Sequence, residues 1–209
     1  MNQRLSLYAV TDGARTNEAQ LHAALAGGVT CVQLREKNLP FDLLVAKAVS
    51  FRKICAQYGV PMIVNDSVDV ALASGADGVH LGQSDGSAAE ARRILGPDAI
   101  LGVSVQTLDE AFLAQKDGAD YLGVGAIFPT ATKLDAQKVA IATLRSICEK
   151  VQIPVVAIGG IGPKEIETLA GTGIAGVAVV SAIFSQPDIT AATAELLERL
   201  RQCEIHSSR

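Results

Sequence analysis

Short apolar runs rich in β-branched residues alternate with longer amphipathic segments along the whole chain. The amphipathic segments repeat their apolar positions with a helical period, most clearly in residues 18–26, 41–58 and 108–116. Because parallel strands need crossover connections, strands that alternate with helices predict a parallel sheet. The eight predicted strands are residues 5–10, 31–34, 62–65, 78–81, 100–104, 121–124, 155–158 and 176–180.

A repeated glycine-led pattern indicates that the sheet closes on itself. Each copy places a helix-ending glycine before one or two small or polar residues and a strand, and the copies start at Gly27, Gly75, Gly118 and Gly173. The spacing corresponds to two strand–helix units. We therefore predict an α/β fold, a single (β/α)8 TIM barrel over residues 1–209 with a loose tail at 204–209. An open doubly wound sheet is the alternative, but no G-x-G-x-x-G motif follows the first strand.

Composition and charge argue against several other classes of protein. With 49 % hydrophobic and 19 % charged residues in 209, the apolar surface is large enough to offset the entropy of chain ordering. The net charge of −4 argues against a broad nucleic-acid surface, and the apolar runs are too short to span a membrane. The four cysteines show no C-x-x-C spacing and are expected to be buried or inert thiols, which favours a reduced, cytoplasmic location.

In a barrel of this kind the active site lies at the carboxyl ends of the strands, and polar residues gather there. After the second strand, the period of two places Gln33, Arg35 and Lys37 on one face, with Leu34 and Glu36 on the other. Two cations and an amide at a barrel mouth form a suitable clamp for an anion, because arginine can hold phosphate oxygens in a fork. A solvated strand end is the alternative.

Two carboxylates follow consecutive strands. Asp66 comes after the third strand and Asp85 after the fourth, so together they can bind one Mg²⁺, which prefers oxygen ligands. Alternatively, Asp66 caps the helix that starts at Ser67, and Asp85 shapes a turn. The basic residues predicted opposite them favour the metal site.

Two further polar residues belong to strands. His80 lies inside the fourth strand rather than beyond it, so we expect a packed, hydrogen-bonded role instead of catalysis. Ser104 ends the fifth strand, where its hydroxyl can donate to a substrate or cap a helix.

Donors suited to phosphate follow the last three strands. The long loop after the sixth strand carries Thr130, Thr132 and Lys133. Glycines 159, 160 and 162 follow the seventh strand, and Val180-Ser181 ends the eighth, where such barrels usually bind phosphate. The sequence thus predicts one site for a pyrophosphate and a metal, and one for a monophosphate. This arrangement suits metal-assisted transfer between two phosphorylated molecules.

Seven motifs along the chain resemble the thiamine phosphate synthase family. They are Leu7-Tyr-Ala-Val-Thr-Asp12, Gln33-Leu-Arg-Glu-Lys37, Val64-Asn-Asp66, Gly78-Val-His-Leu-Gly-Gln83 with Asp85, Tyr121-Leu-Gly-Val-Gly125, Pro129-Thr-Ala-Thr-Lys133 and Ile158-Gly-Gly-Ile161. The resemblance implies a transferase of thiamine biosynthesis. It would condense 4-amino-2-methyl-5-(diphosphooxymethyl)pyrimidine with a thiazole phosphate, with or without a 2-carboxyl group, and release pyrophosphate by a dissociative mechanism.

The resemblance also implies roles for individual residues. Mg²⁺ would be held by Asp66 and Asp85, and Lys133, Arg35 and Ser104 would act in catalysis. The pyrimidine pyrophosphate would bind Gln33, Leu34, Arg35, Glu36, Lys37, Asn65, Ser104 and Lys133. The thiazole phosphate would bind Thr130, Ala131, Thr132, Gly160, Val180 and Ser181.

Two alternatives to this function remain. A related thiazole tautomerase on the same barrel would not need a pyrophosphate clamp with a metal pair. A non-catalytic sensor of phosphorylated ligands would keep the glycine site, but has no need of Lys37, Asp66, Asp85 and Lys133 together. The partners expected in each case are small phosphorylated molecules, with neither nucleic acid nor membrane.

Overall fold

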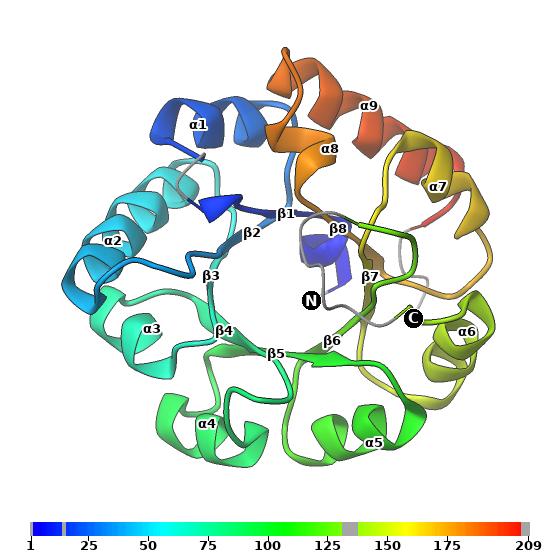
Figure 1. The fold of residues 1–209 in the computed structure, drawn as a ribbon, viewed down its shortest axis with the longest axis horizontal. Coiled ribbons are helices and arrows are strands. Elements are labelled where there is room, and N and C mark those ends of the chain that lie inside the picture. The colour runs from blue at the N-terminus through cyan, green and yellow to red at the C-terminus, as the bar shows by residue number, and fades with distance from the viewer. Residues whose placement is uncertain (1, 14–15, 131–137, 206–209) are drawn as a thin grey trace.

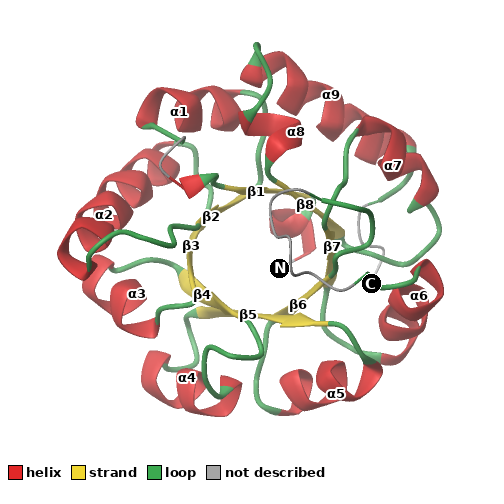
Figure 2. Cartoon of the chain, in the orientation of Figure 1, coloured by secondary structure: helices red, strands yellow, loops and turns green. Residues whose placement is uncertain are grey.

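Eight parallel strands close into a barrel in which each strand pairs with its neighbours in chain order and β1 pairs with β8. The computed structural model describes residues 2–13, 16–130 and 138–205. Helices surround the barrel on its outside (Figure 1, Figure 2). The predicted (β/α)8 barrel is confirmed.

The strands are short. After an N-terminal 3-10 helix, η1 (Asn2–Leu5), each strand in the described ranges is followed by one helix, except that β8 is followed by two. The strands are β1 (Leu7–Val10), β2 (Cys31–Leu34), β3 (Met62–Asn65), β4 (Gly78–Leu81), β5 (Ile100–Val105), β6 (Tyr121–Val124), β7 (Val155–Ile158) and β8 (Gly176–Val179). The helices are α1 (Glu18–Ala26), α2 (Phe41–Gln57), α3 (Val68–Ser74), α4 (Ala88–Leu95), α5 (Leu108–Lys116), α6 (Ile141–Lys150), α7 (Pro163–Thr168), α8 (Ser181–Phe184) and α9 (Ile189–Gln202).

The two ends of the chain differ from the sequence-based prediction. Leu5 belongs to η1 rather than to the first strand, and its side chain packs inside the barrel. Gly176 permits this close approach, because a Cβ there would lie 2.0 Å from the carbonyl oxygen of Leu5. The loose tail does not begin at Glu204: Ile205 is buried in the core, and its amide donates to the Leu200 carbonyl at 3.0 Å. Residues 206–209 lie outside the described ranges.

The core has two layers, set by the alternation of side chains along each strand. The larger layer fills the space between the strands and the helices, with Leu34, Val64 and Leu122 among its members. The smaller layer lies inside the barrel and includes Tyr8 and Tyr121. Inward and outward residues therefore have different neighbours, and this distinction decides which strand-end residues reach the mouth.

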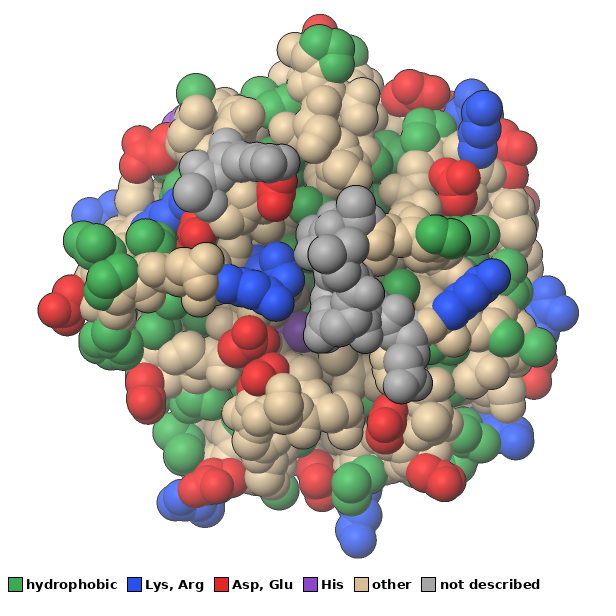
Figure 3. Space-filling model, viewed as in Figure 1, with side chains coloured by type: hydrophobic (Ala, Val, Ile, Leu, Met, Phe, Trp, Pro, Cys, Tyr) green, Lys and Arg blue, Asp and Glu red, His purple; other side chains and the backbone are tan. Residues whose placement is uncertain are grey.

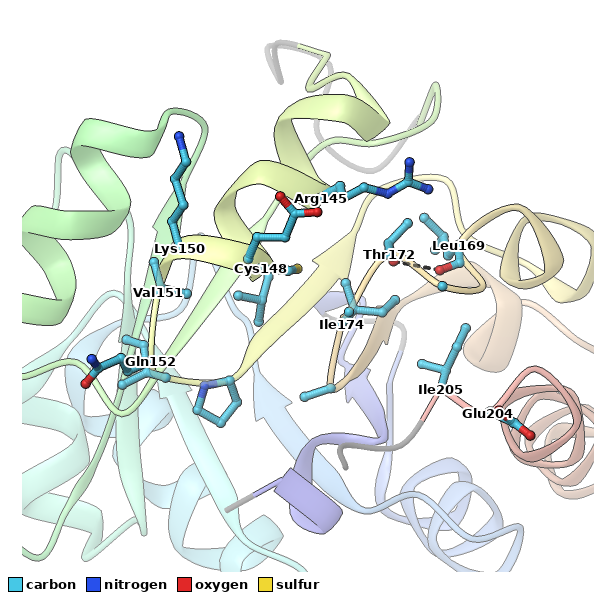
Figure 4. A pocket seen from close by; sticks show the side chains of 17 residues that line it. Arg145, Cys148, Lys150, Val151, Gln152, Leu169, Thr172, Ile174, Glu204 and Ile205 are labelled. Atoms are coloured by element: carbon cyan, nitrogen blue, oxygen red, sulfur yellow. Dashed lines mark hydrogen bonds between the residues drawn. The ribbon is translucent and has the colours of Figure 1, made fainter. Parts of the chain in front are cut away.

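A surface hollow of about 830 Å³ lies at the end of the barrel opposite the mouth (Figure 4). It is lined by the end of α6 and by the segments that lead into β7 and β8, with Arg145, Lys150 and Thr172 among its residues. The Thr172 hydroxyl donates to the Leu169 carbonyl at 2.6 Å, within the hollow. In this fold, loops before the strands serve stability, so the hollow is not our candidate site.

None of the helices in the described ranges is long and apolar enough to cross a lipid bilayer.

Gly102 in β5 gives a test of the packing inside the barrel. A Cβ on this residue would lie 2.1–2.4 Å from ring and hydroxyl atoms of Tyr121. We therefore expect Gly102→Ala to lower the free energy of unfolding by about 3 kcal/mol or more, measured by urea denaturation. Gly162→Ala is the matched control, because its Cβ would meet only the movable end of Glu165, at 3.1 Å. Equal losses in the two variants would contradict this account of the interior.

Candidate active site

Charged side chains of both signs gather at the mouth of the barrel. Figure 3 shows basic and acidic groups side by side near the centre of this face, over the ends of β2 to β5. The positive charges of Arg35 and Lys37 act directly on the carboxyl of Asp66, and so does the negative charge of Asp85. Four predicted site residues from three strand ends therefore converge.

The segment after β2 is held in place through its backbone. The buried hydroxyl of Thr11, at the end of β1, accepts from the Arg35 amide at 2.9 Å and donates to the Arg35 carbonyl at 3.3 Å. Glu36 points away from the mouth: its carboxylate is 4 % exposed and forms an ion pair with Lys47 of α2. The side chain of Leu34 lies in the outer core layer. Any contact of Leu34 with a ligand at the mouth must therefore come from its backbone.

Asp66 has an unusual backbone conformation. Its φ of 66° lies in the left-handed region, and its amide donates to the His80 carbonyl at 2.8 Å. It does not cap α3, since that role belongs to Ser67, whose hydroxyl accepts from the Val70 amide at 3.2 Å. A residue other than glycine held at positive φ is costly and is often found at functional sites.

The two carboxyl groups face each other. Partial burial, a side-chain hydrogen bond with Asp85 and the charge of Asp85 raise the pKa of Asp66 to about 6, while Arg35 and Lys37 act in the opposite direction. Asp85 also shapes a turn, as the alternative interpretation expected, because its Oδ2 accepts from the Gly82 amide at 2.7 Å. The turn and the carboxylate pair therefore coexist, with the turn holding Asp85 toward its partner.

A chain of hydrogen bonds crosses the inside of the barrel. The Gln33 amide nitrogen donates to the Tyr8 hydroxyl at 3.0 Å, and the Tyr8 and Tyr121 hydroxyls lie 2.9 Å apart. The Tyr121 hydroxyl lies 2.8 Å from His80 Nδ1, and His80 Nε2 lies 2.8 Å from Ser104 Oγ. Five strands contribute to the chain, and its two ends are predicted substrate-binding residues. Neither tyrosine was anticipated from the sequence.

His80 is buried and bonded through both ring nitrogens, so the packed role predicted for it is confirmed. Burial lowers its pKa to about 4, since the charged imidazolium loses its hydration there. Glycine at 102 and 123 leaves room for the imidazole and its partner: a Cβ on Gly123 would lie 3.0 Å from the His80 ring. Ser104 caps no helix, because the hydroxyl of Thr107 caps α5.

The predicted monophosphate site lies where the loops after β6 and β7 touch. The Phe128 amide donates to the Gly159 carbonyl at 3.0 Å. Gly160 has a φ of 65°, and a Cβ on it would lie 2.3 Å from the Pro129 carbonyl oxygen, so only glycine fits. Thr130 is partly buried beside this contact, and Ser181 starts α8 after β8. Ala131, Thr132 and Lys133 lie outside the described residues.

Comparison with known proteins agrees with this geometry. A family described as thiamine monophosphate synthase matches residues 7–183. A protein of Ruminiclostridium cellulolyticum named thiamine-phosphate synthase is 51 % identical over 197 residues, which cover 92 % of this chain and 94 % of that protein. A solved structure of thiamine phosphate pyrophosphorylase from Pyrococcus furiosus has a TM-score of 0.90 at 40 % identity, covering 97 % of this chain and 98 % of that one.

The chain belongs to the thiamine monophosphate synthase family. The family resemblance and the transferase class predicted from the motifs are thereby confirmed. A structure of 3-hexulose-6-phosphate synthase, 18 % identical with a TM-score of 0.69, shares the fold alone.

Within the family barrel, the mouth residues fit a hard divalent cation. Two carboxylates from adjacent strand ends supply the oxygen ligands that Mg²⁺ prefers. No cluster of three or more acidic, histidine or cysteine ligands occurs in the part of the chain that the structure describes. That fits Mg²⁺, which is usually bound by one or two carboxylates plus waters and substrate phosphates.

The carboxylate pair gives a prediction that needs no substrate. Asp66→Asn keeps a side chain that tolerates positive φ but removes one of the two facing charges. In chelator-containing buffer we expect its melting temperature to rise by about 2 °C at neutral pH, since like-charge repulsion is lost. Adding Mg²⁺ should stabilise the wild type but not the variant.

Asp98→Asn, in the loop before β5, is the control for that experiment. It should respond to Mg²⁺ as the wild type does. Equal stabilisation of the Asp66 variant by Mg²⁺ would contradict the metal assignment.

His80 gives a prediction about pH. Its pKa is about 4 in the folded protein and 6.5 in an unfolded chain, so below pH 6.5 the unfolded chain binds the proton first. This group's contribution is complete above pH 6.5 and declines by about 3 kcal/mol as the pH falls to 4. The stability of His80→Gln should therefore fall less steeply over that range, measured by denaturant unfolding. Parallel pH curves for the two proteins would contradict the assignment.

Proposed function

We propose that the chain condenses 4-amino-2-methyl-5-(diphosphooxymethyl)pyrimidine with a thiazole phosphate to give thiamine phosphate and pyrophosphate. The observation that carries the proposal is the convergence of Arg35 and Lys37 with Asp66 and Asp85 at one side of the mouth. Cations and a carboxylate pair together suit a pyrophosphate bound with a metal. The curated relatives named thiamine-phosphate synthase, about half identical over almost the whole chain, support the same activity.

On the charged side of the mouth, Arg35 and Lys37 bind the pyrophosphate group and offset its charge as it leaves. Thr11 holds the backbone of Arg35 through two hydrogen bonds, so the side chain that carries the guanidinium extends from a fixed position. Lys133 is proposed to join them. Mg²⁺, held by Asp66 and Asp85, would supply further positive charge to the departing oxygens.

The reaction replaces one bond to the methylene carbon with another. The carbon–oxygen bond breaks first, and its electron pair leaves with pyrophosphate. The thiazole nitrogen then donates its lone pair to the resulting pyrimidinylmethyl cation and forms the carbon–nitrogen bond. The protein therefore needs to supply neither a nucleophilic side chain nor a strong base.

The site residues are consistent with that requirement. His80 has both ring nitrogens occupied by hydroxyls and a pKa of about 4, which makes it a poor proton acceptor. Catalysis then comes from holding the partners close and from charge stabilisation.

The thiazole phosphate is proposed to bind on the opposite side of the mouth. The loops after β6 and β7 contact each other at Gly160 and Pro129, next to Thr130, and Val180-Ser181 follows β8. Glycine lets backbone amides approach an anion closely. A monophosphate anchored here would leave the thiazole ring free to face the pyrimidine.

The test is an assay with both substrates that follows pyrophosphate and thiamine phosphate, with Mg²⁺ and with a chelator. We expect the wild type to require Mg²⁺. Asp85→Asn should lower kcat/KM by about 10²-fold, because it removes one of the two carboxylates proposed to hold the Mg²⁺ that stabilises the leaving group. Asp98→Asn should behave as the wild type.

The possible outcomes separate the parts of the proposal. Full turnover in chelator would contradict the proposed Mg²⁺ requirement but not the proposed synthase activity. A wild type that rearranges a thiazole phosphate without the pyrimidine substrate would instead be a tautomerase. Binding of both phosphates without turnover would leave a sensor of phosphorylated ligands.

A further inference from the structure

The hydrogen-bond chain buries polar groups inside the barrel, which costs free energy and is not needed to form the fold. Interiors of such barrels are usually filled by branched apolar side chains, as Ile63, Ile100 and Val156 do here. Tyr8, Tyr121 and His80 instead bring polar groups into the same layer, all of them buried. Polar groups buried in this way must be fully bonded to be tolerated, and no buried side-chain nitrogen or oxygen in the described residues lacks a partner.

The interior is also shaped to let these groups meet. In the register of the sheet, His80 lies beside Gly102, which lies beside Tyr121. Because Gly102 has no side chain, the histidine and the tyrosine bond across it at 2.8 Å. Gly123 likewise leaves space beside the imidazole and Ser104.

One set of donor and acceptor roles satisfies every link of the hydrogen-bond chain. Gln33 donates to Tyr8, which also contacts the Cys31 thiol; in this set the Tyr8 hydroxyl donates to Tyr121, and Tyr121 donates to His80 Nδ1. A neutral imidazole then carries its hydrogen on Nε2 and donates to Ser104. The Ser104 hydrogen is left for a ligand at the mouth, and so are the carbonyl oxygen and the second amide hydrogen of Gln33.

The direction of the links thus fixes the orientation of the Gln33 amide and leaves the Ser104 hydrogen free to donate. Turning the Gln33 amide over reverses every link, so that Gln33 presents its hydrogens and Ser104, whose hydrogen then goes to His80, can only accept. A ligand edge with a donor next to an acceptor matches either direction. The amino group and the adjacent ring nitrogen of a 4-aminopyrimidine form such an edge.

We propose that Tyr8, Tyr121 and His80 are positioning residues that fix the orientation of the Gln33 amide and decide whether the Ser104 hydroxyl donates or accepts, and thereby select the amino edge of the pyrimidine. This inference rests on the proposed function, since it takes the pyrimidine pyrophosphate as the substrate. None of the three touches the reacting atoms; they act through the two residues at the ends.

The decisive variant is Tyr121→Phe, which breaks the chain in the middle and keeps the ring that packs against Tyr8. We expect calorimetry to show affinity for the pyrimidine pyrophosphate about tenfold weaker, because Gln33 and Ser104 are no longer held in register. Affinity for inorganic pyrophosphate should stay the same, since the charged clamp is untouched. The KM for thiazole phosphate should also be unchanged.

A second readout tests the choice of edge directly. The ligand is the same pyrophosphate ester with hydrogen in place of the 4-amino group. Its binding, rather than its turnover, is compared, because the amino group also donates electrons to the ring during reaction. The wild type should prefer the amino ligand by about 10²-fold or more, and Tyr121→Phe should lose about tenfold of that preference.

Tyr58, the third tyrosine of the protein, lies outside the hydrogen-bond chain and supplies the matched control. Tyr58 follows α2 on the surface, where its hydroxyl lies 3.2 Å from His22 Nδ1, so Tyr58→Phe removes a hydroxyl outside the site. Tyr8→Phe breaks the chain one link earlier. It should reproduce the loss of preference even if Tyr121→Phe does not fold.

The outcomes distinguish the inference from the function beneath it. If the broken-chain variants lose stability but keep the wild-type preference for the amino edge, the chain is structural and the inference is wrong. If the wild type itself forms no thiamine phosphate from the two substrates, the proposed function is wrong, and the inference that rests on it is wrong as well.

Discussion

Alternation of side chains along short strands is the constraint on which this active site depends. A residue at the end of a barrel strand faces either the inside and the mouth, or the helices outside. Thus Gln33 and Arg35 are available at the mouth, whereas Leu34 packs in the outer layer and Glu36 pairs with Lys47. The strand that carries or immediately precedes them, β2, has only four residues, and a register shift of one position would exchange the two sets.

The barrel interior is divided by depth. Near the closed end, Leu5 and its apolar neighbours fill the space and give the fold its stability. Toward the mouth, the layer becomes polar, and each hydroxyl or ring nitrogen is bonded to the next. Such a network is stabilising only when it is complete, so a single missing link affects both packing and recognition. Gly102 and Gly123 are the sequence features that make this layer possible.

The sequence carried the strand pattern and the mouth residues, because both depend on local periodicity. The same reasoning placed Asp66 and Asp85 together, since consecutive parallel strands end at one edge. It missed the contact of Tyr8 with Tyr121, which joins residues 113 positions apart across the barrel. Periodicity indicates that both tyrosines point inward, but not which inward residue each one meets. The start of the chain was misassigned for a similar reason, because the turn of η1 depends on its contact with β8.

Charge is distributed unevenly around the mouth, and in the proposed reaction this asymmetry follows the movement of electrons. The departing pyrophosphate gains negative charge beside Arg35 and Lys37, while the pyrimidine left behind gains positive charge over the residues that bind its edge. A protonated His80, hydrogen-bonded to Ser104, would oppose the forming cation by like-charge repulsion. Burial instead holds the imidazole neutral, with a pKa of about 4, and its hydrogen bonds make it polar without net charge. In the proposed reaction, the hydrogen-bond chain that orients the substrate edge therefore also keeps positive charge away from the carbon that becomes the cation.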